Sequence, residues 1–203
     1  LLQENKINSS DIKMIIHGTT LATNAVIERK GAKTCFITTE GFRDVLDIGY
    51  ESRFDQYDIL IEKTMSLVPR KHRYVIEERT DINGSIIKPI NAKKFQSLVD
   101  TIKKEKFESI GIGFLHSYAN SKNENDLKEF LLKHLPDLEV SISSDVCPEI
   151  REYERFTTTV VNSYIKPLMS RYLKKLESEL KQKGFNCPLL LMTSGGTLTN
   201  VAS

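Results

Sequence analysis

The chain has 203 residues, of which 39% are hydrophobic and 28% are charged, and its formal net charge is +2 at pH 7. A chain of this length and ordinary composition buries roughly two thirds or more of its unfolded surface, in one or two domains. No apolar stretch reaches the roughly 20 residues of a membrane span, and no signal-peptide pattern opens the chain. We therefore expect a cytoplasmic protein that does not bind a membrane, and the small net charge argues against nucleic-acid binding.

Apolar runs alternate with amphipathic segments, which is the pattern of strands joined by crossover helices. Gly31 is expected to end the helix predicted near 20–30 with a positive φ, and Asn91 to cap the helix predicted near 91–105 at its N-terminus. Gly184 is expected to close the helical segment predicted near 149–183. The last helical segment is expected to be two helices, because Pro167 removes a backbone donor and clashes with the preceding turn. Strands are predicted near residues 12–17, 33–38, 109–115, 138–142 and 188–193, and helices near 20–30, 91–105, 122–134 and 149–183.

The segment 72–89 departs from this alternation. Two β-rich runs flank Asn83 and Gly84, and Asn-Gly favours a tight hairpin turn in which both central residues adopt positive φ. A hairpin inserted before a helix fits an α/β sheet of mixed direction. The Gly-Ile-Gly at 111–113 lacks the third glycine of a dinucleotide-binding fingerprint and lies within a strand pattern, where close packing explains it.

The cysteines and histidines give no sign of a metal site. Cys35, Cys147 and Cys187 are odd in number, far apart and without C-x-x-C spacing, so neither a disulfide framework nor a thiolate metal site is expected. Cys35 lies in an apolar run and is predicted to be a small core residue. The four histidines are scattered, with no spacing typical of a zinc site.

A first polar cluster follows the first predicted strand. The apolar run leads directly into His17, Gly18, Thr19 and Thr20 and then into a helical pattern that contains Asn24. Open α/β sheets bind ligands where strands end and helices begin. These groups could orient substrate or phosphate through neutral hydrogen bonds. Two structural alternatives stay open, in which Thr20 is only a helix N-cap and His17 is only a hydrogen-bonded residue at a strand end.

A second cluster comprises Arg43, Asp44, Arg53, Tyr57 and Asp58. The planar fork of an arginine suits carboxylate or phosphate, so Arg53 could hold an anionic ligand. Arg43 and Asp44 could instead form a local ion pair, which stabilises little on a solvated surface.

A third cluster, Glu149, Arg151, Glu152 and Arg155, opens the last helical segment. It could be a ladder of solvated ion pairs, or it could approach a ligand cleft. Residues 194–197, Ser-Gly-Gly-Thr, follow an apolar strand, so their backbone amides could face an anion. They lack the spacing and the lysine of a Walker A loop, and a tight turn is the simpler interpretation.

Long stretches of the chain resemble the hydantoinase A and 5-oxoprolinase family, and the resemblance covers essentially all of it. The stretches that carry it are HGTTLATNAVIER and GAKTCFITTEGFRDVLDIGYESR, FDQYDI, LVPR, RYVIEERTDINGSIIKP, FLHSYAN, SSDVCPEIREYERFTTTVVNSYIKPLMSRYL and LLLMTSGG. The resemblance implies an actin-like, ribonuclease-H-like α/β fold with crossover helices. It also implies ATP-driven attack on a carbonyl: phosphorylation of the carbonyl oxygen lets water open a cyclic amide such as a hydantoin or 5-oxoproline.

The resemblance also implies cofactors, partners and site residues. It places most of the N-terminal family domain at residues 1–145 and the start of the hydantoinase A domain at 146–203. It implies ATP with Mg²⁺, a cyclic amide or ketone substrate, a hydantoinase B-like partner subunit and an oligomeric enzyme. Together with the clusters above, it assigns catalytic roles to His17, Thr19, Thr20 and Arg53. Substrate or nucleotide binding is assigned to Asn24, Tyr57, Asp58, Glu149, Arg151, Arg155, Ser194, Gly195 and Gly196.

The chain departs from the family pattern at its start. The family opens with a glycine-rich phosphate loop of the DxGGTxTD type, and no such segment precedes Leu1. The later phosphate-binding and adenosine-binding segments would lie beyond Ser203. We therefore expect an internal piece of a longer polypeptide, an incomplete fold that does not hydrolyse ATP alone. The alternatives are a subunit of an ATP-dependent ketone carboxylase and a non-catalytic interaction or scaffold piece.

Overall fold

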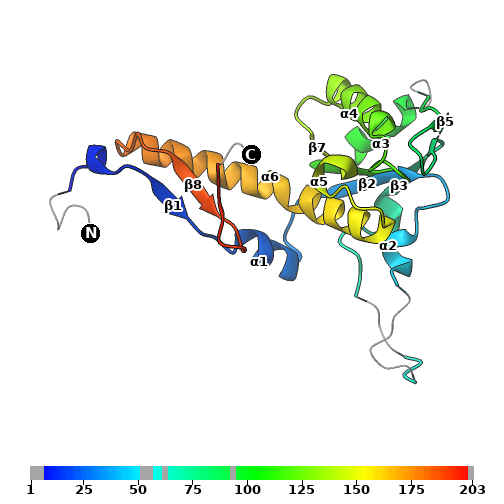
Figure 1. Ribbon diagram of the computed structural model, residues 1–203, viewed down its shortest axis with the longest axis horizontal. Coiled ribbons are helices and arrows are strands. Elements are labelled where there is room, and N and C mark those ends of the chain that lie inside the picture. Colours follow the sequence, from blue (N-terminus) through cyan, green and yellow to red (C-terminus); the bar gives the residue numbers. More distant parts are fainter. Residues whose placement is uncertain (1–6, 51–56, 61–63, 92–94, 201–203) are drawn as a thin grey trace. The chain divides into compact units, whose positions relative to one another are not determined.

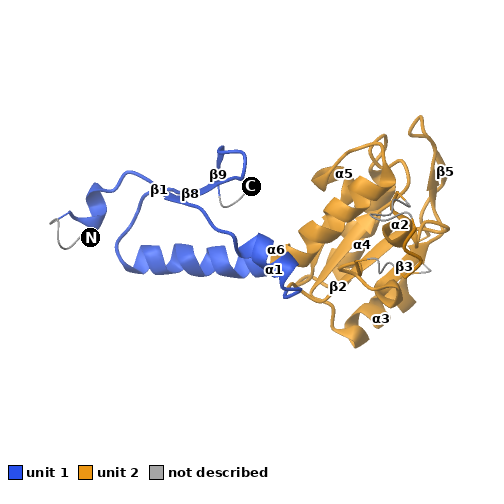
Figure 2. Ribbon diagram, turned by 90° about the horizontal axis from the view of Figure 1, so that it is seen from below, with its two compact units in different colours: residues 1–30, 168–203 blue, residues 31–167 orange. Residues whose placement is uncertain are grey.

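The computed structural model describes residues 7–50, 57–60, 64–91 and 95–200. The chain divides into two compact units, shown in different colours in Figure 2. Unit 1 comprises residues 1–30 and 168–203, and unit 2 comprises residues 31–167. Each unit has its own sheet and is described separately.

Within the described part of unit 2, four parallel strands form a sheet in the order β3-β2-β6-β7. Every residue of the central strands β2 and β6 is buried, as expected of parallel strands that are covered on both faces. The register pairs Cys35 with Ile110, and Ile110 with Val140. The strands are β2 (Thr34–Thr39), β3 (Arg73–Ile76), β6 (Ser109–Gly113) and β7 (Glu139–Ile142).

Helices cover both faces of this sheet (Figure 1). On one face, α3 (Gln96–Glu105) and α4 (Lys122–His134) bury side chains such as Val99 and Leu127 against Ile110. On the other face, the first half of α6 (Glu152–Gln182) packs Phe156 against Phe36, with ring centroids 5.3 Å apart. The short helices α2 (Val45–Ile48) and α5 (Ser143–Val146) and the 3-10 turn Arg70–His72 complete unit 2.

The predicted hairpin is present, but its turn differs from the prediction. Strands β4 (Arg79–Thr80) and β5 (Ile86–Lys88) pair antiparallel as a separate sheet. Gly84 has a φ of +84°, whereas Asn83 is not among the residues with positive φ. The Asp81 carboxylate accepts hydrogen bonds from the amides of Asn83 (2.9 Å) and Ser85 (2.7 Å). This acceptor favours a longer, aspartate-stabilised turn over a two-residue one.

Unit 1 contains a smaller sheet of mixed direction. Among its described residues, β1 (Ile15–His17), β8 (Leu189–Met192) and β9 (Leu198–Asn200) lie in the order β1-β8-β9. Strand β1 is parallel to β8, and β9 is antiparallel to it. The unit also holds the 3-10 turn Ser9–Asp11, α1 (Leu21–Ile27) and the part of α6 that follows Pro167.

The prediction of two helices separated at Pro167 is wrong, because α6 is one helix of 31 residues with Pro167 inside it. A proline in a helix interior costs roughly 3 kcal/mol through its missing donor and its contact with the previous turn. Burial on both sides offsets that cost: Phe156 and Val160 are buried in unit 2, and Leu173 is buried in unit 1. Gly184 ends the helical segment with a φ of +82°, as predicted.

Gly31 does not cap α1 as predicted. Arg29 has the positive φ instead, at +56°, and the Lys30 amide donates to the Ala25 carbonyl over 2.9 Å. Gly31 is required by packing, since a Cβ at this position would lie 2.2 Å from the ring of Tyr164. Glycine is therefore needed here because an aromatic ring approaches the backbone closely, and not because the residue ends a helix.

The remaining elements lie close to their predicted ranges, with one further correction. Helix α3 begins at Gln96, with Phe95 and not Asn91 at its N-cap position. Cys35 is fully buried in the core as predicted, and burial raises the pKa of its thiol. All three cysteines lie within the described residues as free thiols. No helix in the described ranges is long and apolar enough to cross a membrane.

Candidate functional site

The sheet of unit 1 brings two of the predicted polar segments to one edge. Strands β1 and β8 are parallel, and His17 is paired with Leu191. Their carboxyl ends therefore lie side by side, so the residues after His17 and the loop after Met192 emerge at the same edge. Open α/β sheets bind ligands at this edge. We call it the carboxyl-edge site: His17, Thr19, Thr20, Asn24 and residues 194–196.

The β1 side of the carboxyl-edge site presents exposed hydroxyl and amide side chains. Thr19 Oγ1 accepts a hydrogen bond from the Leu21 amide over 3.1 Å. Thr20 occupies the N-cap position of α1, but its hydroxyl makes no capping bond. Thr20 and Asn24 are exposed, and no side-chain hydrogen bond joins either of them to another described residue. Because α1 has only seven residues, the site depends on these side chains and not on the helix dipole.

His17 is held in place by α6. Its Nε2 lies 2.8 Å from the hydroxyl of Tyr172, and the two ring centroids are 5.7 Å apart. Both side chains are partly buried. In the described chain, Nδ1 of His17 has no hydrogen-bond partner, so one ring nitrogen is engaged by the fold and the other is available.

The β8 side of the site is the tight turn that the sequence predicted. The Thr193 amide donates to the Thr197 carbonyl over 2.9 Å, and the two hydroxyls lie 2.7 Å apart. Gly196 has a φ of +81° and donates to the Thr193 carbonyl over 3.0 Å. Ser194 and Gly195 are exposed, and their backbone amides have no acceptor among the described residues. Two adjacent free amides can bind an anionic oxygen.

The second predicted cluster belongs to unit 2 and is only partly described. Arg53 lies outside the described residues. Tyr57 is 90% exposed, and Asp58 Oδ1 accepts from the Leu60 amide over 2.8 Å, as in an Asx turn. The roles assigned to Arg53, Tyr57 and Asp58 stay predictions.

The local ion pair between Arg43 and Asp44, which the sequence left open as an alternative, is not formed. Asp44 instead accepts two hydrogen bonds from Arg70, over 2.8 and 3.0 Å, and this partner holds the pKa of Asp44 below its usual range. Arg43 donates to the Arg70 carbonyl over 2.8 Å. A second pair joins Arg73, 1% exposed, to Asp47 through two bonds of 2.7 Å. Local spacing missed both pairs, because each spans 26 residues.

Arg155 is not part of a solvated ladder. Its side chain is fully buried, and its guanidinium donates to the backbone carbonyls of Glu149, Ile150 (3.0 Å) and Phe114 (3.2 Å). The guanidinium carbon also lies 5.4 Å from the ring centroid of Tyr118. Burial lowers the pKa of Arg155. These contacts favour a structural role, in which Arg155 fixes the chain before α6, and the binding role assigned to it stays a prediction.

Arg151 lies on the surface, in a small cluster with aromatic residues. Its guanidinium is 3.8 Å from the Glu154 carboxylate, and three quarters of its side chain is exposed. The Tyr50 hydroxyl donates to Glu154, which lowers the pKa of Glu154 and raises that of Tyr50. Tyr50 and Tyr153 meet edge to face with ring centroids 5.0 Å apart. Arg151 therefore remains accessible to a ligand or partner.

Sequence patterns missed a buried carboxylate that closes the carboxyl end of the four-stranded sheet. Glu124 is fully buried and accepts from the Phe114 amide (2.9 Å), the Ser143 hydroxyl (2.6 Å), and the amide (2.9 Å) and hydroxyl (2.7 Å) of Ser144. These partners come from the residues that follow β6 and β7. Four donors satisfy the charge of a buried carboxylate, so Glu124 is a structural group.

Glu78 is a second buried carboxylate at this end of the sheet, with 3% of its surface exposed. It accepts hydrogen bonds from the Thr39 hydroxyl and from Asn123 Nδ2, the latter over 2.8 Å. Burial raises the pKa of Glu78. The other amide atom of Asn123, Oδ1, is buried without a hydrogen-bond partner in the described structure.

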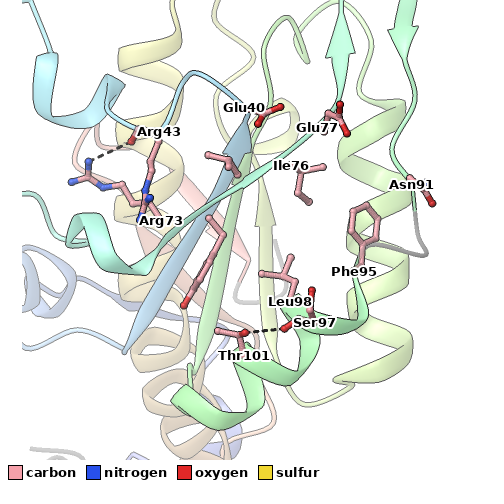
Figure 3. Close-up of a pocket in the computed structure, with 12 residues that line it drawn as sticks. Glu40, Arg43, Arg73, Ile76, Glu77, Asn91, Phe95, Ser97, Leu98 and Thr101 are labelled. Carbon is pink, nitrogen blue, oxygen red and sulfur yellow. Dashed lines mark hydrogen bonds between the residues drawn. The ribbon is translucent and has the colours of Figure 1, made fainter.

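Unit 2 also contains a cavity of about 610 Å³ between β3 and α3 (Figure 3). Ile76, Phe95 and Leu98 give it apolar walls, and Glu40 and Glu77 add carboxylates. Its size suits a small organic molecule. Of the three predicted polar clusters, only Arg43 contributes to its lining, and none of the residues assigned a catalytic or binding role does. Across the described ranges, no group of three or more His, Cys, Asp or Glu side chains could hold a metal ion.

Comparison with protein families gives two matches. The model of the hydantoinase/oxoprolinase N-terminal region matches residues 1–135, and the hydantoinase/oxoprolinase model matches residues 155–203. An uncharacterized protein of Methanocaldococcus jannaschii is 41% identical over 203 residues, which are 98% of this chain and 30% of that protein. Caprolactamase subunit alpha of Pseudomonas jessenii is 32% identical over 191 residues, which are 93% of this chain and 27% of that subunit.

The fold is similar to that of a solved enzyme. The crystal structure of ATP-dependent caprolactamase from Pseudomonas jessenii matches with a TM-score of 0.88 and 32% identity, over 95% of this chain and 28% of that one. The chain thus spans less than a third of the length of these relatives. The expected α/β fold of mixed strand direction is confirmed by this likeness. Because a family model matches well over half of its residues, the chain belongs to the hydantoinase/oxoprolinase family.

Proposed function

We propose that this chain is part of an ATP-dependent hydrolase that opens cyclic amides after phosphorylation of the carbonyl oxygen. The observation that carries the proposal is the parallel pairing of β1 with β8, which gathers exposed hydroxyls, two free amides and His17 at one edge. The relatives support the reaction class, since the solved relative is an ATP-dependent caprolactamase. Family and edge together favour an enzyme over a scaffold piece.

The carboxyl-edge site suits an anionic oxygen without needing a charged side chain. We assign the hydroxyls of Thr19 and Thr20 and the amides of Ser194 and Gly195 to the oxygens of a phosphoryl group. Phosphoryl transfer depends mainly on positioning and on stabilising charge that develops on oxygen, which fixed neutral donors do well. ATP would supply the phosphoryl group that activates the amide carbonyl. Among the described residues, these donors fit a phosphoryl group, and no group of three or more His, Cys, Asp or Glu side chains could hold a metal ion. The Mg²⁺ that the family implies would be bound together with the nucleotide.

His17 and Asn24 are assigned to the substrate. The unengaged ring nitrogen of His17 and the exposed amide of Asn24 can each hydrogen-bond a carbonyl oxygen. Water then adds to the activated carbon, and the carbon–nitrogen bond breaks as the ring nitrogen takes up a proton, which leaves an acyl phosphate. A second water hydrolyses the acyl phosphate to the carboxylate and inorganic phosphate. Gly196 is proposed to support binding by holding the turn in shape, since its positive φ and its bond to the Thr193 carbonyl fix the loop that carries the two free amides.

The residues of unit 2 are assigned a second set of contacts. Arg53 is proposed to hold an anionic group through its planar fork, with Tyr57 and Asp58 beside it in sequence. Glu149 and Arg151 are proposed as further binding groups at the start of α6, where Arg151 is exposed. Arg155 contributes least, because backbone carbonyls occupy three of its hydrogen-bond directions.

The wider organisation follows the family. We propose a hydantoinase B-like partner subunit and an oligomeric cytoplasmic enzyme, and a relative is indeed named as a subunit. The domain division at 145/146 remains part of the proposal. The compact units described above are divided differently along the chain.

The test uses the natural full-length polypeptide with its partner subunit. ATP hydrolysis is measured with caprolactam, hydantoin or 5-oxoproline, in wild type and in the His17→Ala and Thr20→Val variants. Loss of a donor to developing charge is expected to lower turnover by about 10²–10³-fold, with little change in unfolding. Thr23→Val is the matched control, since Thr23 is an exposed threonine of the same helix.

Three outcomes would contradict the proposal. Equal loss of turnover and of stability in both variants would assign these residues to the fold. Dependence of ATP turnover on a ketone and bicarbonate would indicate a carboxylase. Absence of ATP binding by the natural polypeptide would indicate an interaction module.

A further inference from the structure

Tyr172 of α6 is the residue that fixes the ring of His17. The Tyr172 hydroxyl and His17 Nε2 are 2.8 Å apart, although the residues are 155 positions apart in sequence. Both belong to unit 1, and both are partly buried. The next residue on the helix, Leu173, is buried, so the backbone that carries the hydroxyl is anchored in the core of this unit.

The direction of this hydrogen bond determines which ring nitrogen of His17 carries the proton. A neutral imidazole has one N–H and one lone pair, and a partner on one nitrogen selects the tautomer. If Nε2–H donated to Tyr172, the phenolic hydrogen would have no acceptor among the described residues. If the Tyr172 hydroxyl donates to Nε2, the phenolic hydrogen and the lone pair on Nε2 are both paired, and the proton of the ring lies on Nδ1.

We propose that Tyr172 is a positioning residue that holds His17 in the Nδ1–H tautomer. His17 then presents a neutral N–H donor, and not a lone pair, to the ligand. This N–H can donate to an oxygen atom of the ligand, such as the carbonyl oxygen of an amide or an oxygen of a phosphoryl group. His17 then acts by hydrogen bonding and not as a general base. This last consequence rests on the proposed function, whereas the tautomer is a property of unit 1 itself.

The tautomer can be measured directly by nitrogen NMR. In the intact protein labelled with ¹⁵N-histidine, the protonated and unprotonated ring nitrogens have different shifts, and His17→Gln identifies the His17 signals. Wild type is expected to show predominantly the Nδ1–H form at neutral pH. Tyr172→Phe keeps the ring contact but removes the hydroxyl, so the population is expected to shift to the Nε2–H form that histidine favours in water.

Tyr153→Phe is the matched control. It removes a hydroxyl from the same helix, at a ring that packs on Tyr50 and not on His17, so the His17 signals should not change. In the full-length enzyme, Tyr172→Phe is expected to lower kcat by about tenfold, the equivalent of one neutral hydrogen bond, with KM nearly unchanged. Tyr153→Phe should leave both parameters at the wild-type value.

Each outcome decides the inference. An Nε2–H signal in wild type, or a tautomer that Tyr172→Phe leaves unchanged, would overturn it, and the wild-type spectrum decides this even if the variant folds poorly. If the tautomer shifts as expected but neither Tyr172→Phe nor His17→Ala affects turnover, the positioning holds and the proposed function fails. The two ideas therefore fail separately.

Discussion

Gly113 lets two buried aromatic rings pack directly on β6, and replacing it with alanine tests that packing. A Cβ built at Gly113 would lie 2.5 Å from Phe156 Cδ1 and 2.7 Å from Phe36 Cζ, well inside the 3.5–4.0 Å of ordinary carbon contacts. Both rings are almost fully buried, so they must move by about 1 Å within a packed core. Overpacking of this kind costs roughly 1–3 kcal/mol.

The net effect includes the unfolded chain. Replacing glycine by alanine reduces the freedom of the unfolded state and stabilises a protein by about 0.4–1 kcal/mol. We therefore expect Gly113→Ala to lower the free energy of unfolding of unit 2 by about 1–2 kcal/mol. Urea unfolding followed by circular dichroism measures this, and hydrogen exchange of the β6 amides assigns the loss to unit 2.

Gly111 provides the matched control, because it lies in the same strand and faces the same helix. A Cβ there would lie 3.0 Å from Ser163 Oγ and 3.1 Å from Phe36 Cδ2, so its neighbours need to give only a few tenths of an ångström. Gly111→Ala should stay within about 0.5 kcal/mol of wild type, since the small clash and the entropy gain offset each other. Equal stability of the two variants, or a larger loss in Gly111→Ala, would refute this account of the packing.

Two further predictions concern buried charges. Because burial raises the pKa of Glu78, the native state binds the carboxyl proton more tightly than the unfolded chain does. Protonated Glu78 therefore stabilises the fold below the ordinary glutamate pKa, and this contribution is lost as the pH rises through the raised pKa of the native state. Glu78→Gln should flatten that pH dependence in urea unfolding above the ordinary glutamate pKa of about 4.3; an unchanged slope would contradict it. Arg73→Lys loses the two-point bond to Asp47 and the bond to the Val68 carbonyl, so thermal unfolding should show a loss of about 2–4 kcal/mol. Arg70→Lys, at an exposed ion pair, should leave stability nearly unchanged. Equal losses of stability in Arg73→Lys and Arg70→Lys would show that burial does not decide the strength of these pairs.

The strands were predictable because the signal for a buried parallel strand is local. A short run of apolar and β-branched residues, such as β2 or β8, can be recognised as a strand without knowledge of its neighbours. The fate of Pro167 was not predictable in this way. Its local cost is fixed, but whether the helix continues depends on what both halves bury, and that burial is made by segments far away in sequence.

Glycine positions show the same limit. Gly184 and Gly84 have the positive φ that their local patterns indicate, whereas Gly31 is explained only by the ring of Tyr164. No spacing in the sequence connects residues 133 positions apart, so close approach looks the same as a helix cap until the fold is known. In the site, His17 is identifiable as a polar residue after a strand, but nothing in the local sequence marks Tyr172, 155 positions away, as its partner.

The contacts within the fold also separate the candidate residues into two kinds. Arg155 and Glu124 are buried, and backbone and hydroxyl groups of the chain occupy their hydrogen-bonding groups, so removing either one leaves buried partners unsatisfied whatever the protein binds. Thr20, Asn24 and Ser194 are exposed, and within the described structure their side chains make no hydrogen bond. A change at these three positions costs the fold little. If they nevertheless prove sensitive in an activity assay and insensitive in an unfolding assay, a ligand at the carboxyl-edge site is the remaining physical cause.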